Sequence, residues 1–224
     1  PVTPTVMGIG SMSKDDPYYV GPIGSLGVGS ANSLSKDTDL ALAIGTKLGD
    51  FTTGSWSNFH NPDFKLVSIN AARFDVTKHR ATPVVSDAKV GLRELTKKLD
   101  DWKAPANWYE RARKEAKEWD QYVAKASGPT NQELPTYAHA VGAVYRNADP
   151  SDVVVTAAGG LVGEAVQIWK PKKINTFETE WGFSCMGYEI SGALGMKMAK
   201  PDQDFIVFIG DGSYLLQNSD IYSS

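Results

Sequence analysis

The stretch Phe205-Ile206-Val207-Phe208-Ile209-Gly210-Asp211-Gly212-Ser213 combines an apolar strand, a turn of small residues and the beginning of a helix. In open α/β sheets, ligands gather at the carboxyl ends of the strands. The helix that follows offers free N–H groups and the positive end of its dipole. Glycines also let the backbone approach a ligand closely. The stretch therefore predicts an α/β fold with an anion-binding turn at Gly210 to Ser213.

Asp211 gives this turn its chemistry. A carboxylate repels a phosphate group unless a cation lies between the two, and Mg²⁺ is typically held by one or two carboxylates together with substrate phosphates. Asp211 is therefore a candidate metal ligand. The turn by itself leaves a second interpretation open, in which Gly210-Asp211-Gly212 is a tight turn with an aspartate that caps the helix.

The first hundred residues show the same alternation of strand and helix. Residues 39–45 and 64–70 are short apolar runs, which we interpret as buried parallel strands. Residues 30–36 are helix-like, and residues 87–95 form a second helix with Asp87 as its N-cap candidate. Alternating strands and helices indicate a parallel sheet.

A charged helical segment follows. From residue 107 to residue 127 the apolar residues recur at steps of three and four, which predicts an amphipathic helix that ends at Gly128-Pro129. We interpret Trp102, Trp108 and Trp119 as anchors that pack this segment against its neighbours. Residues 103–130 are the expected connection between two α/β units.

The second unit repeats the pattern and adds two more loops rich in glycine, at residues 157–163 and 181–187. Its expected elements are helix 136–146, strand 152–156, a glycine loop, strand 174–177, helix 187–200 and strand 205–209. Three loops thus converge on one sheet edge. None of the glycine-rich segments matches the dinucleotide fingerprint or the P-loop, which disfavours nucleotide binding by those two devices.

Composition narrows the class of protein. The 224 residues include 23 basic and 26 acidic side chains, a net charge of −3 that gives no electrostatic case for a nucleic-acid or membrane partner. Cys185 is the one cysteine, which excludes an internal disulfide and fits a cytoplasmic protein. No leader or membrane-spanning run is visible. Both ends, Pro1 and Ser224, have the character of cuts in a longer chain.

Several residues near the glycine loops have ordinary structural interpretations. We expect Cys185, next to a methionine, to be a small buried apolar residue and not a nucleophile. Glu178 and Glu180 are expected to be solvated carboxylates at a strand end. No residue of the chain is nominated as catalytic.

Taken together, the glycine loop, Phe183-Ser184-Cys185-Met186-Gly187 and Gly210-Asp211-Gly212-Ser213 resemble the cofactor half of thiamine diphosphate (ThDP) enzymes such as acetohydroxyacid synthase and pyruvate decarboxylase. Three segments resemble more closely the 3D-(3,5/4)-trihydroxycyclohexane-1,2-dione hydrolases of inositol catabolism: residues 50–53, 178–189 and 210–214. This resemblance covers nearly the whole chain.

The resemblance implies a set of site residues. Asp211 matches the Mg²⁺ ligand of the family motif, and Met186 matches the apolar support under the bent cofactor. Ser184 matches the position whose backbone carbonyl accepts a hydrogen bond from the aminopyrimidine. The cofactor-binding residues are then Gly160, Ser184, Met186, Gly210, Gly212 and Ser213. The asparagine that completes the metal site in the family, and its activating glutamate, have no counterpart in this chain.

The resemblance also implies fold and function. It predicts two incomplete α/β domains with parallel sheets: a central Rossmann-like domain at 1–102 and a ThDP-binding domain at 131–224, joined by the helical linker 103–130. The implied reaction is ThDP- and Mg²⁺-dependent hydrolysis of the bond between the adjacent carbonyls of the cyclic dione, which gives 5-deoxy-glucuronate. A homodimer or homotetramer is expected, and the isolated fragment is expected to be inactive.

Two alternatives stay open at this point. One is a ThDP-dependent carboligase of the acetohydroxyacid synthase type, with FAD in the central domain. The other is a non-catalytic nucleotide- or phosphate-binding module that uses the same glycine turn.

Overall fold

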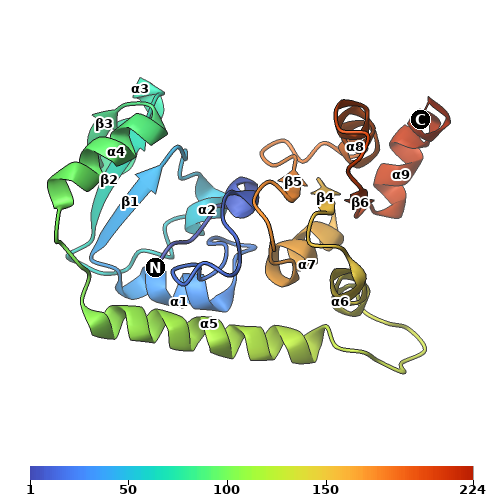
Figure 1. Cartoon of the computed structure of the whole chain (residues 1–224), viewed down its shortest axis with the longest axis horizontal. Coiled ribbons are helices and arrows are strands. Elements are labelled where there is room, and N and C mark those ends of the chain that lie inside the picture. The colour runs from blue at the N-terminus through green and yellow to red at the C-terminus, as the bar shows by residue number, and fades with distance from the viewer. Residues whose placement is uncertain (224) are drawn as a thin grey trace.

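The computed structural model describes residues 1–223 and has the expected α/β architecture, with two parallel sheets. Figure 1 shows the sheets side by side, with the long helix α5 (Ala106–Ala126) running beneath both parts. Within the described chain, no helix combines the length and apolar character needed to cross a bilayer.

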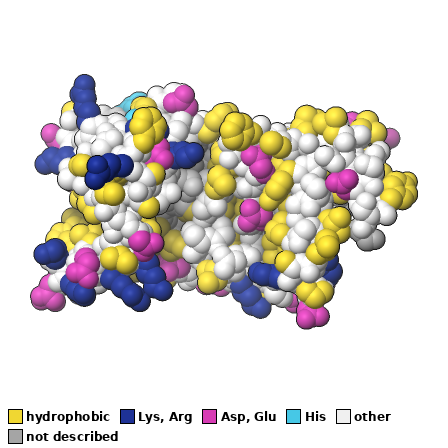
Figure 2. Space-filling model, turned by 90° about the horizontal axis from the view of Figure 1, so that it is seen from above, with side chains coloured by type: hydrophobic (Ala, Val, Ile, Leu, Met, Phe, Trp, Pro, Cys, Tyr) yellow, Lys and Arg dark blue, Asp and Glu magenta, His cyan; other side chains and the backbone are white. Residues whose placement is uncertain are grey.

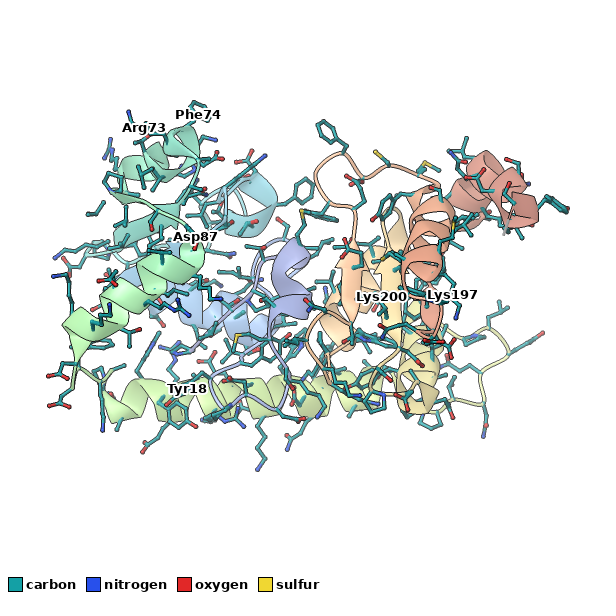
Figure 3. All side chains as sticks on the ribbon, turned by 45° about the horizontal axis from the view of Figure 1, so that its top comes forward. Tyr18, Arg73, Phe74, Asp87, Lys197 and Lys200 are labelled. Atoms are coloured by element: carbon teal, nitrogen blue, oxygen red, sulfur yellow. The ribbon has the colours of Figure 1, made fainter. Side chains whose placement is uncertain are left out.

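The first sheet has the order β1-β2-β3 and is parallel throughout. Its strands are β1 (Leu40–Ile44), β2 (Lys65–Asn70) and β3 (Thr82–Val85), and the surrounding helices are α1 (Gly29–Asp37), α2 (Asp50–Thr53), α3 (Arg73–Val76), η2 (Lys78–Arg80) and α4 (Ala88–Leu99). Asp87, labelled in Figure 3, caps α4 as predicted, because its Oδ1 accepts a hydrogen bond from Val90 N at 3.0 Å.

The prediction that both early strands are buried is wrong for β1. Leu40, Leu42 and Ile44 share one face of this strand and remain 37–52% exposed. β1 lies at an edge of the sheet, and α4 packs on the central strand β2 instead. The apolar run therefore predicted the strand correctly and its burial incorrectly.

The second sheet has the order β5-β4-β6, so β4 (Val153–Thr156) lies in the middle and is fully buried. β5 (Phe177–Thr179) and β6 (Phe205–Val207) flank it, both parallel to it. The helices of this part are α6 (Tyr137–Asn147), α7 (Gly160–Ile168), α8 (Tyr188–Ala199) and α9 (Asp211–Gln217), followed by η3 (Asn218–Ser223).

Two expectations about this sheet need correction. β5 begins at Phe177 and not at Ile174, because Asn175 adopts a left-handed φ of 59° and its N–H bonds to Gly10 outside the sheet. The segment after β4, expected to be a glycine loop, turns at Gly159 and continues directly as helix α7.

The N-terminal segment contributes to the core of the second sheet. Helix η1 (Val6–Ser11) packs on β5, and Asn175 N donates to Gly10 O at 2.7 Å. Val6 and Ile9 are buried in one cluster with β4 and β5. The N-terminal segment and residues 141–208 thus build this core together. The domain limits 1–102, 103–130 and 131–224 stay a prediction.

Helix α5 is held by two of its tryptophans. Trp108 and Trp119 pack with the buried Ala112 against a cluster that includes α1. A Cβ on Gly29 would lie 2.8 Å from the Trp119 ring, so the helices approach closely there. The anchor interpretation is wrong for Trp102, which is 63% exposed.

We predict opposite effects on stability for two identical glycine substitutions in helices. A Cβ at Gly142 in α6 would lie 2.3 Å from the backbone oxygen of Ser127, so Gly142→Ala should destabilise the protein by about 1–3 kcal/mol. A Cβ at Gly195 in α8 meets nothing within 4 Å, so Gly195→Ala should stabilise it by up to about 1 kcal/mol. Urea unfolding measures both changes, and equal midpoints would contradict the packing at Gly142.

Candidate functional site

Three loops meet at the carboxyl edge of the second sheet. Residues 157–159 lead from β4 to α7, residues 180–187 from β5 to α8, and residues 208–210 from β6 to α9. The three strands are adjacent and parallel, so their carboxyl ends lie together. Figure 1 shows α8 and α9 beside each other at this part of the molecule, and the two helices are in contact.

A buried carboxylate ties the first two loops together. Glu189 in α8 is fully buried, and its Oε1 accepts a hydrogen bond from Ala158 N at 3.1 Å. Its Oε2 accepts a second one from Gly187 N at 2.9 Å. Sequence reasoning missed this residue. One feature of the sequence could have indicated a buried carboxylate: Glu189 stands two positions after a glycine, at the start of a helix that is otherwise largely apolar.

The second loop also contacts α9. Gly187 has a left-handed φ of 96°, and a Cβ there would lie 2.2 Å from the side chain of Gln217. At the other end of α9, Met186 Cε lies 3.1 Å from the position of a Cβ on Gly212. The structure therefore brings Met186 and Gly212 together, two residues that the resemblance assigned to one site.

Glu180 shapes the loop from within. Its Oε2 accepts a hydrogen bond from Cys185 N at 2.6 Å, and its Oε1 accepts one from Phe183 N at 3.3 Å. Ser184, between these two residues, has a left-handed φ of 51°. The interpretation of Glu180 as a merely solvated carboxylate is therefore wrong.

The same loop corrects the expectation for Cys185. Its side chain is exposed and not buried, because the loop is held by hydrogen bonds to Glu180 and not by packing of its own side chains. Phe183 is 92% exposed, while the Trp181 ring meets the Phe51 ring of α2 edge-on at 5.3 Å. This last contact links the loop to the part of the chain that carries the first sheet.

Two helix starts at this edge are available to an anion. The N-cap residues are glycines, Gly159 for α7 and Gly210 for α9, so no N-cap side chain bonds to the first N–H groups of either helix. In α9 the Gly212 N–H donates instead to Asp211 Oδ1. β4 and β6 are neighbours, so the two helices begin at the same edge. A Cβ at Gly159 or Gly210 would meet nothing within 4 Å, so there is open space beside both. Exposed N–H groups and helix dipoles favour negative charge in such a place.

Asp211 is the exposed first residue of α9, and its Oδ1 accepts a hydrogen bond from Gly212 N at 2.9 Å. The N-cap position is Gly210, which argues against the interpretation of Asp211 as an ordinary capping aspartate. Ser213 is buried in the same turn. Gly160 lies at the start of α7 and not in a loop, and a Cβ there would meet the Tyr137 ring at 2.9 Å.

Within residues 1–223, no group of three or more histidine, cysteine, aspartate or glutamate side chains could hold a metal ion. A cation at Asp211 would therefore need oxygen ligands from a bound molecule or from water. Mg²⁺ is usually bound in this way, through one or two carboxylates and substrate phosphates.

The β5 side of the edge carries negative charge. Burial raises the pKa of the Glu178 carboxyl. Burial also raises the pKa of the Tyr188 hydroxyl, and the negative charges of Glu178 and Glu180 act in the same direction. A phosphate group is therefore better placed on the other side, between the starts of α7 and α9.

Comparison with known proteins identifies the class that this fold and site define. Residues 1–95 match the central domain of thiamine pyrophosphate enzymes, and residues 157–223 match their C-terminal TPP binding domain. The chain belongs to the thiamine pyrophosphate (ThDP) enzyme family.

Three similar curated proteins are named 3D-(3,5/4)-trihydroxycyclohexane-1,2-dione hydrolase. The relative from Lacticaseibacillus casei is 34% identical over the whole chain, and the one from Geobacillus thermodenitrificans is 33% identical over the whole chain. The Clostridium tetani relative is 33% identical over 92% of the chain. The chain spans 38%, 38% and 36% of the lengths of these three relatives, respectively.

We predict that Glu189→Gln loosens the site and destabilises the protein. The carboxylate has two acceptor oxygens, one for Ala158 N–H and one for Gly187 N–H, whereas the amide has only one. One of these two buried donors therefore loses its partner. The expected cost is about 1–3 kcal/mol in urea unfolding. Glu133→Gln, in an exposed loop, is the matched control and should stay within about 0.5 kcal/mol of the parent. Equal stability of the two variants would contradict the proposed bridge.

Proposed function

We propose that the protein to which this chain belongs is a ThDP- and Mg²⁺-dependent hydrolase. Its substrate would be 3D-(3,5/4)-trihydroxycyclohexane-1,2-dione, cleaved between the adjacent carbonyls to give 5-deoxy-glucuronate. Membership of the ThDP enzyme family and the shared name of the relatives support the proposal. The structural observation that carries it is that α7 and α9, which follow the adjacent strands β4 and β6, both begin after glycines at the edge where Asp211 is exposed.

The residues of the chain would divide the work of binding. Asp211 would hold Mg²⁺, which screens the aspartate from the diphosphate, while the backbone at Gly210, Gly212 and Ser213 would face the phosphates. Met186, which already contacts Gly212, would support the cofactor from below. ThDP, when bound, supplies an electron sink for the carbanion that bond cleavage leaves behind.

The other two residues have supporting roles in this proposal. Ser184 would present its carbonyl to the aminopyrimidine from a loop that Glu180 holds in place on both sides of it. Gly160 would bring the first N–H groups of α7 to the diphosphate. We assign no catalytic residue to this chain, whose part is to bind, orient and shield the cofactor.

We further propose that the site is completed by a second subunit in a homodimer or homotetramer, in the cytoplasm. Exposed apolar side chains on the loop and the C-terminal helices support such an interface: Phe183, Met186, Tyr214, Leu215, Leu216 and Tyr222. Figure 2, which looks onto the top of Figure 1, shows hydrophobic side chains gathered over the half built on β4 to β6. Patches of this kind mark protein contacts.

Asp211→Asn should weaken the Mg²⁺-dependent binding of ThDP. The substitution keeps the size of the side chain and removes the charge that attracts the ion, so we expect at least about a tenfold loss of ThDP affinity. Tryptophan quenching by ThDP in the full-length protein, with and without Mg²⁺, measures it. Asp202→Asn, at an exposed turn, should bind normally. Equal quenching in the Asp211→Asn and Asp202→Asn variants would show that Asp211 is not a metal ligand.

A product assay tests the reaction. The full-length protein with ThDP and Mg²⁺ should convert the cyclic dione to 5-deoxy-glucuronate, with loss of activity on chelation of the metal. Formation of acetolactate from pyruvate instead would assign the protein to the carboligases. Absence of both activities together with absence of ThDP quenching would favour a phosphate-binding module without catalysis.

A further inference from the structure

A cavity of about 290 Å³ lies away from the cofactor site, between the N-terminal segment, α5 and the last turn of α7. Residues 14–22 lie alongside α5 here. Figure 3 shows Tyr18 over this helix, and its ring contacts the Tyr109 ring at a centroid distance of 5.5 Å. The cavity is formed by parts of the chain that are far apart in sequence, so folding alone brings its lining together.

The lining is rich in positive charge. Four basic side chains line the cavity: Lys14, Arg113, Lys117 and Lys170. The only acidic side chain in the lining is Asp120. Asp120 pairs with Lys170, and Lys14 pairs with Asp15 at 2.6 Å. Within residues 1–223, Arg113 and Lys117 form no salt bridge with a carboxylate. Both side chains are exposed to solvent, and in the described chain neither charge has a protein counter-charge.

Two buried donors point to a missing partner. The hydroxyl of Tyr19, a residue only 5% exposed, and the indole Nε1 of Trp119 are both buried, and neither has a hydrogen-bond partner within the described chain. Both residues line the cavity. Buried polar groups in native proteins are almost always hydrogen-bonded, and an unpaired one calls for a bound water or ion.

Burial and repulsion also act on the lysine at the end of α7. Burial lowers the pKa of the Lys170 amino group to about 8, and the positive charges of Lys14 and Arg113 act in the same direction. A bound anion would relieve this repulsion. Arg113 is already oriented, since its Nη1 donates to Pro17 O at 3.3 Å.

We propose that this cavity binds a phosphate group carried by a small organic molecule. A phosphate monoester has a charge of about −1.5 to −2 at neutral pH, which matches the two unbalanced cations better than a single carboxylate does. Its oxygens accept hydrogen bonds from both orphan donors and from Arg113. Apart from Gln167, the remaining lining is largely apolar, and Val20, Val28 and Val166 face the organic part of the ligand in this proposal.

The site is independent of the cofactor. The first residue of α7 lies at the carboxyl edge of the second sheet, whereas the chain just after α7, at Trp169 and Lys170, lines the cavity. Val166, the cavity-lining residue of α7 nearest its start, is six positions after Gly160, which is a rise of roughly 9 Å along the helix. Loss of ThDP binding and loss of phosphate binding are therefore distinguishable.

Inorganic phosphate is the probe for the first experiment. In full-length protein labelled with 5-fluorotryptophan, we expect the ¹⁹F resonance of Trp119, assigned by its loss in Trp119→Phe, to shift saturably with phosphate. The exposed Trp102 should not respond. Sodium chloride at equal ionic strength and sodium acetate serve as the other two titrants, and neither should reproduce the shift.

Substitutions then test the lining. Arg113→Gln combined with Lys117→Gln should weaken phosphate at least about tenfold, and Tyr19→Phe should weaken it severalfold. Lys114→Gln, on the exposed side of α5 and outside the cavity, should bind like the parent. Thermal melting followed by circular dichroism checks that each variant is folded.

Three results would overturn the proposal. They are no saturable shift with phosphate in the folded parent, the same shift with chloride, or equal affinities for the Arg113/Lys117 and Lys114 variants. The first means that the cavity does not bind phosphate, the second that the shift is a general salt effect, and the third that phosphate binds outside the Arg113 and Lys117 lining. Saturation by acetate without saturation by phosphate would equally reject the phosphate assignment.

Discussion

The buried carboxylate of Glu189 is the interaction on which the candidate site depends. Its two oxygens accept hydrogen bonds from the loops after β4 and before α8, which are otherwise separate segments. A carboxylate that loses its water must recover its hydrogen bonds inside the protein, and two backbone N–H groups supply them here. This requirement fixes the relative position of the two loops, and the contact of Met186 with Gly212 extends the arrangement to the third.

The parallel order of the second sheet decides where this arrangement can act. β4 is central, so the elements that follow it and its two neighbours begin at one edge. Helices α7 and α9 begin after glycines that leave open space beside the chain. The acidic residues Glu178 and Glu180 lie on the β5 side. The edge therefore carries the starts of α7 and α9 with Asp211 on one side, and the carboxylates of Glu178 and Glu180 on the other.

Sequence patterns predicted the elements better than their surroundings. The α/β class, helix α5, the Asp87 cap and the Gly210–Ser213 turn follow from local periodicity and residue type, which act within a few positions. The start of β5 depends on a hydrogen bond between Asn175 and Gly10, which no local pattern contains. Exposure of β1 likewise depends on which elements cover it.

In the candidate site, too, local sequence patterns predicted some residues, while others were missed or misinterpreted. The turn at Gly210 to Ser213 and Asp211 as a candidate metal ligand followed from residue type, whereas Met186 was found through resemblance, and the structure places Met186 against Gly212. Glu189 and Glu180 were missed or misinterpreted, because their partners are backbone N–H groups, which every residue type except proline has. Cys185 was expected to be buried from its residue type, but a hydrogen bond of its backbone holds it in an exposed loop.

Helix α7 connects the cofactor site with the basic cavity. Its residues Val162, Ala165 and Val166 are almost fully buried in the main core cluster, so the helix cannot shift without opening that core. Close-packed interiors transmit displacement and do not absorb it. The N–H groups at the start of α7 and the chain at Lys170 just after it are therefore held at a fixed separation. An anion bound at Lys170 would consequently stabilise the N-terminal segment and α5 around a helix whose other end lies at the candidate site.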